Sequence, residues 1–317
     1  MESEERAGRL PNVVAIVLNW NGCADTIRCV ESLQKVVYAI LSIVIVDNGS
    51  SDGSVEKLSK HFPELLILPL QRNGGYGAGN NAGIRYALDH GADYVLILNN
   101  DTVVSPHFLM PLVETLEARK NLGVVTGRVH YLSHQEQLFS GAGRISRLLC
   151  TGLNKGGLFS RSQKPDEGRD INYICGVMLL VKRPVFEQVG FFDEKYFMYF
   201  EDLEFSQRVC RQFTMRYVPT SLLYHKSGGG KGWRSYTETY LYYHTRNRFL
   251  AFENESLLYR GYVSLFSVAV SVGKSFFILM NIVKDSPRAR RQLVSLWRGL
   301  RDGVMLYLSG TMQESER

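Results

Sequence analysis

The sequence predicts an α/β fold with a central, mostly parallel sheet flanked by helices. Short apolar runs rich in Val, Ile and Leu recur from Asn12 onward, each followed by polar or Gly-rich residues and then a helical segment. Strands of about four to eight residues that alternate with helices are typical of βαβ units, whose inner strands are apolar on both faces. The expected strands are Val13–Leu18, Leu41–Val46, Leu65–Leu70, Tyr94–Leu98 and Leu122–Thr126.

The composition is that of an ordinary globular protein. Of the 317 residues, 45% are hydrophobic and 21% are charged, which argues against general disorder. Single cores stop growing near ~250 to 300 residues, so we expect one main domain with a tail. The net charge of +6 is compatible with phosphorylated ligands or an anionic membrane. It is too small to name a partner, and no nucleic-acid partner is expected.

The cysteines and the N-terminus indicate the cellular compartment in which the folded domain lies. The five cysteines are odd in number and form no CxxC pair, so they support neither a disulfide framework nor a zinc site. The charged start MESEERAGRL, within a flexible segment 1–11, has no apolar core and is not a secretory signal. We therefore expect the folded domain to lie in the reducing cytoplasm.

The regular alternation weakens past Arg128. Residues 140–170 are rich in Gly, Ser and Arg and are expected to form a long loop or ragged hairpin. A second ordered block follows, and the acids at the start of its main helix suit the positive end of the helix dipole. Its expected elements are a strand within 172–183, a short helix opened by Pro184, a helix over Glu201–Arg211, a strand at Met215–Val218 and a loop at 224–233.

The residues that follow each strand are the candidate ligand-binding residues, because ligands of such sheets bind beyond the carboxyl ends of the strands. The segment GYGAGNNAG (75–83) opens a helix, so its amides can cradle a phosphate, and GAGNNA satisfies the GxGxxA form of the dinucleotide fingerprint. A simple glycine-rich turn explains the same residues, and both interpretations stay open. The other candidate segments are NWNG (19–22), DNGSSDGS (47–54) and NND (99–101).

Two acids at the ends of expected strands are candidate ligand groups. The carboxylate of Asp47 can accept a hydrogen bond from a base or a ribose, although a capped turn would use the same residues. Asp101 follows Asn99 and Asn100, and a carboxylate beside two carboxamides suits Mg²⁺ or Mn²⁺, which share oxygen ligands with substrate phosphates. A capped turn before Pro106 is the alternative for Asp101.

The second half of the chain carries a pair of acids and a histidine. Glu201 and Asp202 follow an aromatic run; apolar surroundings raise a carboxyl pKa, and a positioned carboxylate can act as general base toward an alcohol. Charges that only suit a helix start are the alternative. His225 can complete a metal or diphosphate site, and the glycines beside Lys231 and Trp233 are expected to form a flap over a ligand.

Seven segments occur in a specific order and spacing. They are VAIVLNWNG, IVIVDNGSSDGS, RNGGYGAGNNAGI, VLILNNDTVV, GFFDEKYFMYFEDLEFSQR, YHKSGGG and RNRFLAF. Together they resemble bacterial family 2 glycosyltransferases, especially the rhamnosyltransferase-like branch, over residues 12–252. The resemblance implies a GT-A type nucleotide-diphospho-sugar transferase fold, a nucleotide-sugar donor, a divalent metal and inversion at the anomeric carbon. It also implies a donor-binding half, 12–128, and an acceptor and catalytic half, 129–252.

The resemblance implies roles for residues of the donor site. Asp47 is expected to contact the nucleotide base, and Asp101 matches the last aspartate of a DxD-type motif, the one that binds the metal at the diphosphate. Asn99 stands where the motif has its earlier aspartate, which removes a negative charge near the diphosphate. The residues expected to shape the rest of the nucleotide-sugar pocket are Asn19, Asn73, Gly75, Asn81, Asn99 and Asn100.

Two further roles follow from the same resemblance. Asp202, beside Glu201, matches the aspartate of the family's ED motif, the base that takes the proton of the acceptor hydroxyl. His225 matches a histidine that binds the metal in some relatives.

Residues 253–317 are expected to form a helical extension. Its segment 261–283 is long enough to cross a bilayer, but a stripe of serines with Lys274 leaves a broad apolar remainder. That pattern favours an amphipathic helix in the membrane interface or one packed on the domain. The basic residues and the Trp that follow suit anionic lipid, and a hairpin that packs on the core or mediates a homodimer is an equal alternative. Membrane contact would place the protein at the inner face of the cell membrane and favour a lipid-linked glycan acceptor.

Three functions are compatible with these observations. The first is an inverting, metal-dependent glycosyltransferase acting in cell-surface polysaccharide synthesis, with rhamnose as one candidate sugar. The second is a sugar-phosphate nucleotidyltransferase, which releases pyrophosphate. The third is a non-catalytic scaffold that binds a nucleotide or a glycan.

Overall fold

A single mixed sheet forms the centre of the molecule. The structure is a computed structural model that describes residues 9–154, 167–226, 236–280 and 286–315. The strand order is β10-β12-β6-β11-β4-β1-β2-β3, with β5 beside β12 and β7 beside β6. The strands are β1 (Val13–Asn19), β2 (Leu41–Asp47), β3 (Leu66–Pro69), β4 (Tyr94–Asn99), β5 (Thr102–Val104), β6 (Leu122–Tyr131), β7 (Leu138–Ser140), β10 (Arg169–Ile171), β11 (Met178–Lys182) and β12 (Thr214–His225).

Most neighbouring strands of the long path are parallel, as predicted. β1 pairs in parallel with β2 and β4, β2 with β3, and β6 with β12, whereas β11 runs antiparallel between β4 and β6. A separate two-stranded hairpin, β8 (Gly143–Ser146) and β9 (Thr151–Asn154), lies within the expected ragged hairpin of residues 140–170. The predicted α/β class with a mostly parallel sheet is confirmed.

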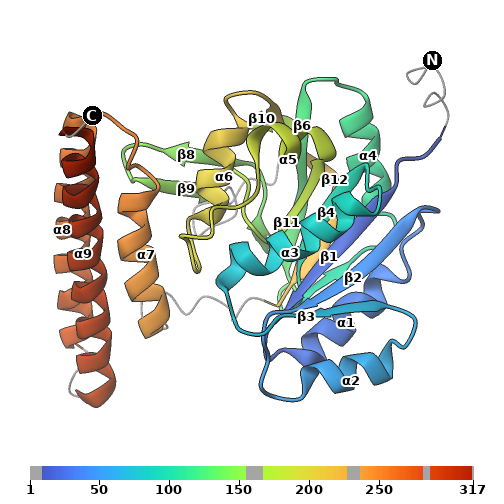
Figure 1. Cartoon of the computed structure of the whole chain (residues 1–317), viewed down its shortest axis with the longest axis horizontal. Coiled ribbons are helices and arrows are strands. Elements are labelled where there is room, and N and C mark those ends of the chain that lie inside the picture. The colour runs from blue at the N-terminus through green and yellow to red at the C-terminus, as the bar shows by residue number, and fades with distance from the viewer. Residues whose placement is uncertain (1–8, 155–166, 227–235, 281–285, 316–317) are drawn as a thin grey trace.

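Helices cover both faces of the sheet (Figure 1). The core on one face contains buried side chains of α1 (Cys23–Leu33), α2 (Ser54–His61) and α4 (Leu109–Glu117). The core on the other face contains those of α3 (Gly75–Asp89), α5 (Arg183–Val189) and α6 (Glu201–Val209). The inner strands β1 and β4 contribute alternate residues to the two cores, which is why their sequences are continuously apolar.

Three further helices form a layer of their own. In Figure 1, α7 (Glu238–Leu250), α8 (Leu257–Met280) and α9 (Ser286–Ser315) stand side by side at the left of the sheet domain. Their shared core includes Phe249 and Val263 and extends to Phe200 and Leu203 at the start of α6. The helical extension is therefore packed against the part of the domain that carries the predicted base.

Several predicted element ends are wrong, and the pairing partners explain why. β6 continues five residues past Thr126, and the expected division of the domain after residue 128 falls inside this strand. β12 continues to His225 because its last residues pair with β5, where a loop had been expected. Of the strand expected within 172–183, only β11 forms, since the residues before it turn toward α6.

Candidate active site

The register of the central strands gathers polar side chains at one edge of the sheet. Asn19 of β1 pairs with Asp47 of β2, and Leu18 pairs with Asn99 of β4. The last residues of three neighbouring parallel strands therefore lie at the same level. This is the edge at which ligands of parallel sheets bind.

A hydrogen-bonded network of buried polar groups occupies the β1 and β2 part of this edge. The Asn19 amide donates to Asp47 at 2.7 Å and to the Ser50 hydroxyl at 3.2 Å. The other Asp47 oxygen accepts from the Ser50 backbone amide at 2.8 Å. Asn100 joins the network by donating to Thr26, whose hydroxyl donates to Asn19. The network fixes the Asp47 carboxylate and leaves each oxygen a second lone pair for a ligand donor.

The amides at the start of the glycine-rich segment make hydrogen bonds within the protein, which favours the simple turn of the two open interpretations. The segment is the first half of α3, and three amides at its start have protein acceptors. Gly74 donates to Asn48, Gly75 to Asn73, and Tyr76 to the carbonyl of Phe197. The role of Gly75 as a nucleotide-binding residue therefore stays a prediction, and Asn73 accepts a hydrogen bond from the Asn48 side chain at 3.0 Å.

These glycines instead allow close packing. Gly75 has φ of +89°, and a Cβ atom there would collide with the backbone of Phe197. A Cβ at Gly83 would lie 2.6 Å from Ile16, so this glycine lets α3 approach the sheet. Helix packing and turn geometry therefore explain the glycines of the GxGxxA match without dinucleotide binding.

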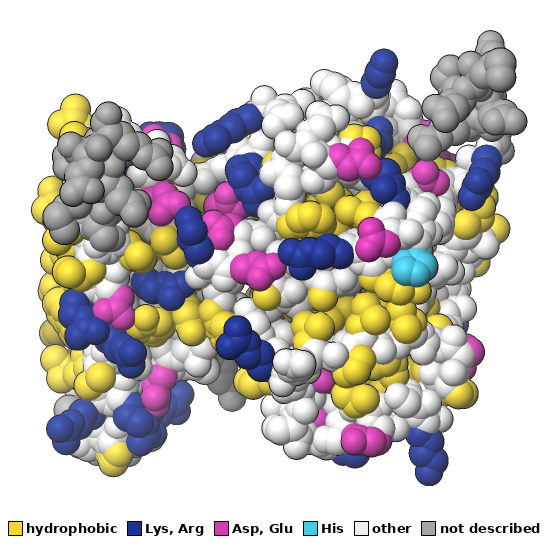
Figure 2. Space-filling view, viewed as in Figure 1, with side chains coloured by type: hydrophobic (Ala, Val, Ile, Leu, Met, Phe, Trp, Pro, Cys, Tyr) yellow, Lys and Arg dark blue, Asp and Glu magenta, His cyan; other side chains and the backbone are white. Residues whose placement is uncertain are grey.

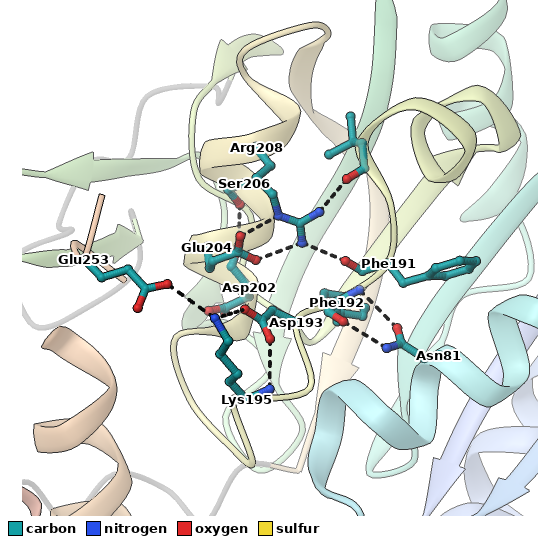
Figure 3. Close-up of polar contacts among 11 residues, drawn as sticks. Asn81, Phe191, Phe192, Asp193, Lys195, Asp202, Glu204, Ser206, Arg208 and Glu253 are labelled. Atoms are coloured by element: carbon teal, nitrogen blue, oxygen red, sulfur yellow. Dashed lines mark hydrogen bonds and ion pairs between the residues drawn. The ribbon is translucent and has the colours of Figure 1, made fainter. Parts of the chain in front are cut away.

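The side chain of Asn81, which was expected to shape the nucleotide pocket, makes its hydrogen bonds within the protein. Its amide oxygen accepts from the Phe192 backbone, and its nitrogen donates to the carbonyl of Phe192 and to Glu194, each at 2.9 Å. Figure 3 shows this clamp beside that of Arg208, which donates to the carbonyls of Val189 and Phe191. Both ends of the Asn81 amide thus bond to the segment that leads into α6, and its expected role in the nucleotide pocket stays a prediction.

Asp101 and His225 meet at the end of β4. His225 is brought there by the pairing of β12 with β5, which places it opposite Thr102. Its Nε2 atom lies 3.0 Å from an Asp101 oxygen. The Phe139 ring packs on the imidazole at 4.6 Å between centroids, so Nε2 is the nitrogen that faces the site. The Asp101 side chain is 30% exposed and accessible to a ligand.

This pair fits a divalent cation that is completed by substrate. Neighbouring ligands of an octahedral ion with bonds of about 2.1 Å are about 3.0 Å apart, which is the separation of the two donor atoms. Within the described residues no group of three or more His, Cys, Asp or Glu side chains could hold a metal. Mg²⁺ and Mn²⁺ often take few protein ligands and share the rest with phosphates, so two protein donors suffice.

Asp202 accepts three hydrogen bonds at the start of α6. One oxygen accepts from the Gly176 amide at 3.0 Å and from the Tyr173 hydroxyl at 2.9 Å, and the other accepts from the Leu203 amide at 2.8 Å. Burial is the larger effect and raises the pKa of Asp202 above its ordinary value, while these donors lower it. The donors orient the carboxyl group of Asp202 and favour its charged form.

Glu201 has the opposite environment. It is buried, and its Oε2 atom has no hydrogen-bond partner within the described chain. Burial, and then the charge of Asp202, raise the pKa of Glu201 to about 8. Burial thus raises the pKa of both acids, and the hydrogen-bond donors around Asp202 favour ionisation of Asp202 over Glu201.

The two centres are linked through residues 176–177. Gly176 donates to Asp202, and the Val177 carbonyl accepts from the Asn99 amide at 3.0 Å. The Tyr76 hydroxyl donates to the Gly176 carbonyl from α3. The metal-type pair after β4 and the acid pair of α6 therefore flank one short segment at the same edge of the sheet.

A strained turn that the sequence did not reveal positions the acid pair. Tyr199 and Phe200 have φ of 69° and 72°, a left-handed conformation that costs about 1–3 kcal/mol at each non-glycine residue. Asn247 of α7 offsets this cost because its amide donates to the carbonyls of Met198 and Tyr199 at 2.9 and 2.8 Å. The RNRF motif signalled this residue, but only the packing of α7 against the turn reveals its positioning role.

The substitution Glu201→Gln is expected to change the pH dependence of stability. The pKa of Glu201 is higher in the folded chain, about 8, than its ordinary value of 4.5, so its contribution to stability is fully present below about 4.5. It is lost as pH rises to about 8, by an amount on the order of 5 kcal/mol. Urea unfolding between pH 4.5 and 8.5 should show a shallower fall for Glu201→Gln. Glu187→Gln, at a side chain that is 53% exposed, is the control and should follow the wild-type curve. Identical curves for wild type and Glu201→Gln would contradict the assignment.

Lys231 and Trp233, the expected acceptor or flap residues, lie outside the described residues. Of the other predicted site residues, the structure gathers Asn19, Asp47, Asn73, Asn99, Asn100, Asp101, Glu201, Asp202 and His225 at one edge of the sheet.

Comparison with known proteins agrees with this geometry. The model of the family described as "Glycosyl transferase family 2" matches residues 14–190, more than half of the chain. An N-acetylglucosaminyl-diphospho-decaprenol L-rhamnosyltransferase of Mycobacterium tuberculosis is 28% identical over 222 residues, which cover 63% of this chain and 71% of that protein. The low-salt glycan biosynthesis hexosyltransferase Agl10 of Haloferax volcanii is 26% identical, over 64% and 63% of the two chains.

Solved structures share the fold at low sequence identity. GalNAc-T7 with UDP, GalNAc and Mn²⁺ has a TM-score of 0.59 at 15% identity, covering 80% of this chain and 52% of the other. The mannosyltransferase PcManGT from Pyrobaculum calidifontis, with GDP-Man and Mn²⁺, has a TM-score of 0.54 at 12% identity, covering 94% and 88%. The expected GT-A fold is thereby confirmed. With the family model matched over most of the strands that build the site, the chain belongs to glycosyl transferase family 2 and is a transferase enzyme.

Proposed function

We propose that the protein transfers a sugar from a nucleotide-diphospho-sugar to a lipid-linked glycan, with inversion at the anomeric carbon. The observation that carries this proposal is the placement of the Asp101–His225 pair and the Glu201–Asp202 pair on either side of residues 176–177. The Asp101–His225 pair suits a metal ion that binds the leaving diphosphate, and the Glu201–Asp202 pair suits a base for the attacking hydroxyl. Rhamnose is the proposed sugar because the mycobacterial relative is named for its transfer.

The donor is held by residues at the ends of β1, β2 and β4. Asp47 accepts hydrogen bonds from the nucleotide base, in an orientation fixed by Asn19 and Ser50. Asp101 and His225 would hold Mg²⁺ or Mn²⁺, which would supply positive charge to balance that of the leaving diphosphate. Asn99 and Asn100 lie beside Asp101 and line the same part of the site.

The acceptor is activated by Asp202. Its carboxylate takes the proton of the acceptor hydroxyl as the oxygen forms a bond to the anomeric carbon. The bond from that carbon to the diphosphate oxygen breaks in the same displacement, and the electron pair stays on the nucleoside diphosphate. Glu201 stays protonated, so it places no second negative charge beside the base. Tyr173 and Gly176 orient Asp202 and keep it ionised.

The outer surface of α8 supports a place at the inner face of the cell membrane. α8 is long and apolar enough to cross a membrane, and 22% of its most apolar window is buried in the protein. Exposed apolar side chains extend along it, among them Leu258, Leu265, Val272 and Phe276. Figure 2 shows such side chains along the outer edge of the helical hairpin, next to Lys and Arg. Apolar and basic groups together suit peripheral contact with anionic lipid better than a homodimer interface.

The released product tests the reaction class. Incubation of the protein with dTDP-rhamnose, Mn²⁺ and a prenyl-diphosphate-linked acceptor should release nucleoside diphosphate in the same amount as the glycosylated acceptor. Chromatography of the nucleotide and phosphate products measures both. Pyrophosphate as the product would instead assign a nucleotidyltransferase, and the absence of turnover across nucleotide sugars would support a binding scaffold.

A further inference from the structure

The polar stripe of α8 faces into the protein rather than toward solvent. Ser267 and Ser271 are 0% and 1% exposed, and Lys274 lies one turn further along the same face. Opposite them, α7 presents His244 and Arg248. The charge of Arg248 acts on both His244 and Lys274; the name "inter-helix polar cluster" is used below for these three side chains together with Ser267 and Ser271.

Every member of the inter-helix polar cluster has a buried polar atom without a hydrogen-bond partner. These atoms are Nδ1 of His244, Nη1 of Arg248, the hydroxyl oxygens of Ser267 and Ser271, and Nζ of Lys274. A buried polar group without a partner costs about 1–3 kcal/mol, and more when it is charged. Five such groups in one place indicate a ligand that supplies the acceptors.

The missing group carries negative charge. Lys274 Nζ lies 5.2 and 5.1 Å from the ring centroids of Tyr236 and Tyr240, and Arg248 lies 5.4 Å from that of Phe266. In the described part of the chain, no salt bridge to an acid is formed by either cation. Burial, and then the charge of Arg248, lower the pKa of Lys274 to about 8. Two buried cations that repel each other are stabilised by an anion between them.

A cavity lies beside Lys274. It has a volume of about 280 Å³ and is lined by Tyr236, Val270, Gly273, Lys274, Phe277 and Ile278. Pockets that enclose drug-sized ligands start near about 300 Å³, so the cavity has room for a head group and not for a whole nucleotide sugar. Lys274 is the member of the cluster that lines this cavity.

The cluster also touches the turn that positions the base. The His244 and Phe200 rings are 5.0 Å apart at their centroids, and the Arg248 guanidinium lies 6.0 Å from the Phe200 ring. Phe200 immediately precedes Glu201 and Asp202. A ligand held by the cluster is therefore separated from the acid pair by one aromatic side chain.

We propose that Lys274 and Arg248, with Ser267, Ser271 and His244, bind the phosphate of a prenyl-phosphate-type lipid, the carrier of the acceptor glycan. This inference rests on the proposed function for the identity of the carrier, and on the unpaired cations for the site itself. Cations and hydroxyls supply the donors that phosphate oxygens accept. Exposed apolar side chains such as Val272 and Phe276 lie on α8, the helix that also lines the cavity, and suit the prenyl chain.

Calorimetric titration of the full chain with farnesyl phosphate tests the site. Farnesyl phosphate should bind wild type, and Lys274→Met should weaken that binding about tenfold or more, because a charge-assisted contact is lost. Arg290→Met is the matched control: it removes one cation from an exposed position on α9 and should bind as wild type does. Lys274→Met should also melt at or above the wild-type temperature, since it removes a buried, unpaired charge.

Three results would overturn the inference. The site is wrong if Lys274→Met binds farnesyl phosphate as wild type does. If uncharged farnesol binds as tightly as farnesyl phosphate, the site is an apolar groove that does not recognise phosphate. The lipid carrier is wrong if inorganic phosphate alone binds as tightly. Binding of dTDP with Mn²⁺, measured on the same variants, reports on the donor site independently and should be unchanged by Lys274→Met.

Discussion

Asp202→Asn is expected to lower the rate of sugar transfer by at least about 10²-fold, the usual contribution of a positioned general base. The carboxamide keeps the volume of the side chain and can still accept a hydrogen bond from Leu203 or Gly176. It cannot take the proton of the acceptor hydroxyl. Because the proposed role of Asp202 is toward the acceptor, binding of the nucleoside diphosphate should stay at the wild-type level. Steady-state rates and calorimetric donor binding measure the two quantities separately.

A matched control separates the base from general changes in charge. Asp193→Asn alters an acid in the same segment, one whose side chain bonds to the Lys195 amide. This variant should keep near wild-type turnover. If Asp202→Asn turns over as fast as Asp193→Asn, Asp202 is not the base. If instead Asp202→Asn loses donor binding as well, its role is structural.

The central strands and the acids at their ends could be predicted from sequence for a local reason. β1 and β4 are continuously apolar and β2 is apolar from Ile43 to Val46, and each ends at a polar residue that the sequence itself marks: Asn19, Asp47 and Asn99. A parallel register then brings these ends together without further information. The helix start at Glu201 is equally local, because the acids suit the dipole.

The glycine-rich segment shows where local pattern fails. A glycine is required both where a phosphate approaches a backbone and where another part of the protein does. Only the tertiary structure reveals that Gly75 faces the backbone of Phe197 and that Gly83 faces Ile16. The same holds for Asn81, whose partners lie more than a hundred residues further along the chain.

The contacts that α7 and α8 make also could not be predicted from the sequence. The serine stripe predicted an amphipathic helix, but it could not reveal which face would be outward. The packing turns Ser267, Ser271 and Lys274 inward toward α7 and leaves the apolar side chains exposed. Likewise, Asn247 acts on residues 198–199 of a strained turn that no propensity predicts.

Asp101→Ala is expected to abolish the metal-dependent part of donor binding. Asp101 is the carboxylate of the two-donor pair after β4, and removing it leaves His225 alone to hold the cation. Changes in residues that only support a metal ligand lower metal affinity about 10- to 100-fold, and loss of a ligand should cost at least as much. Asp47 and its network are untouched, so weak binding of the nucleotide without metal should persist.

Calorimetric titration of dTDP into the protein, with and without Mn²⁺, measures this effect and tests the metal-bound donor site most directly. Asp25→Ala is the control, because it removes a neighbouring carboxylate that pairs with Lys226 and not with His225. Wild type and Asp25→Ala should bind dTDP at least about tenfold more tightly with Mn²⁺, and Asp101→Ala should bind equally with and without it. An equal gain from Mn²⁺ in all three proteins would contradict the account, because the metal would then be held elsewhere.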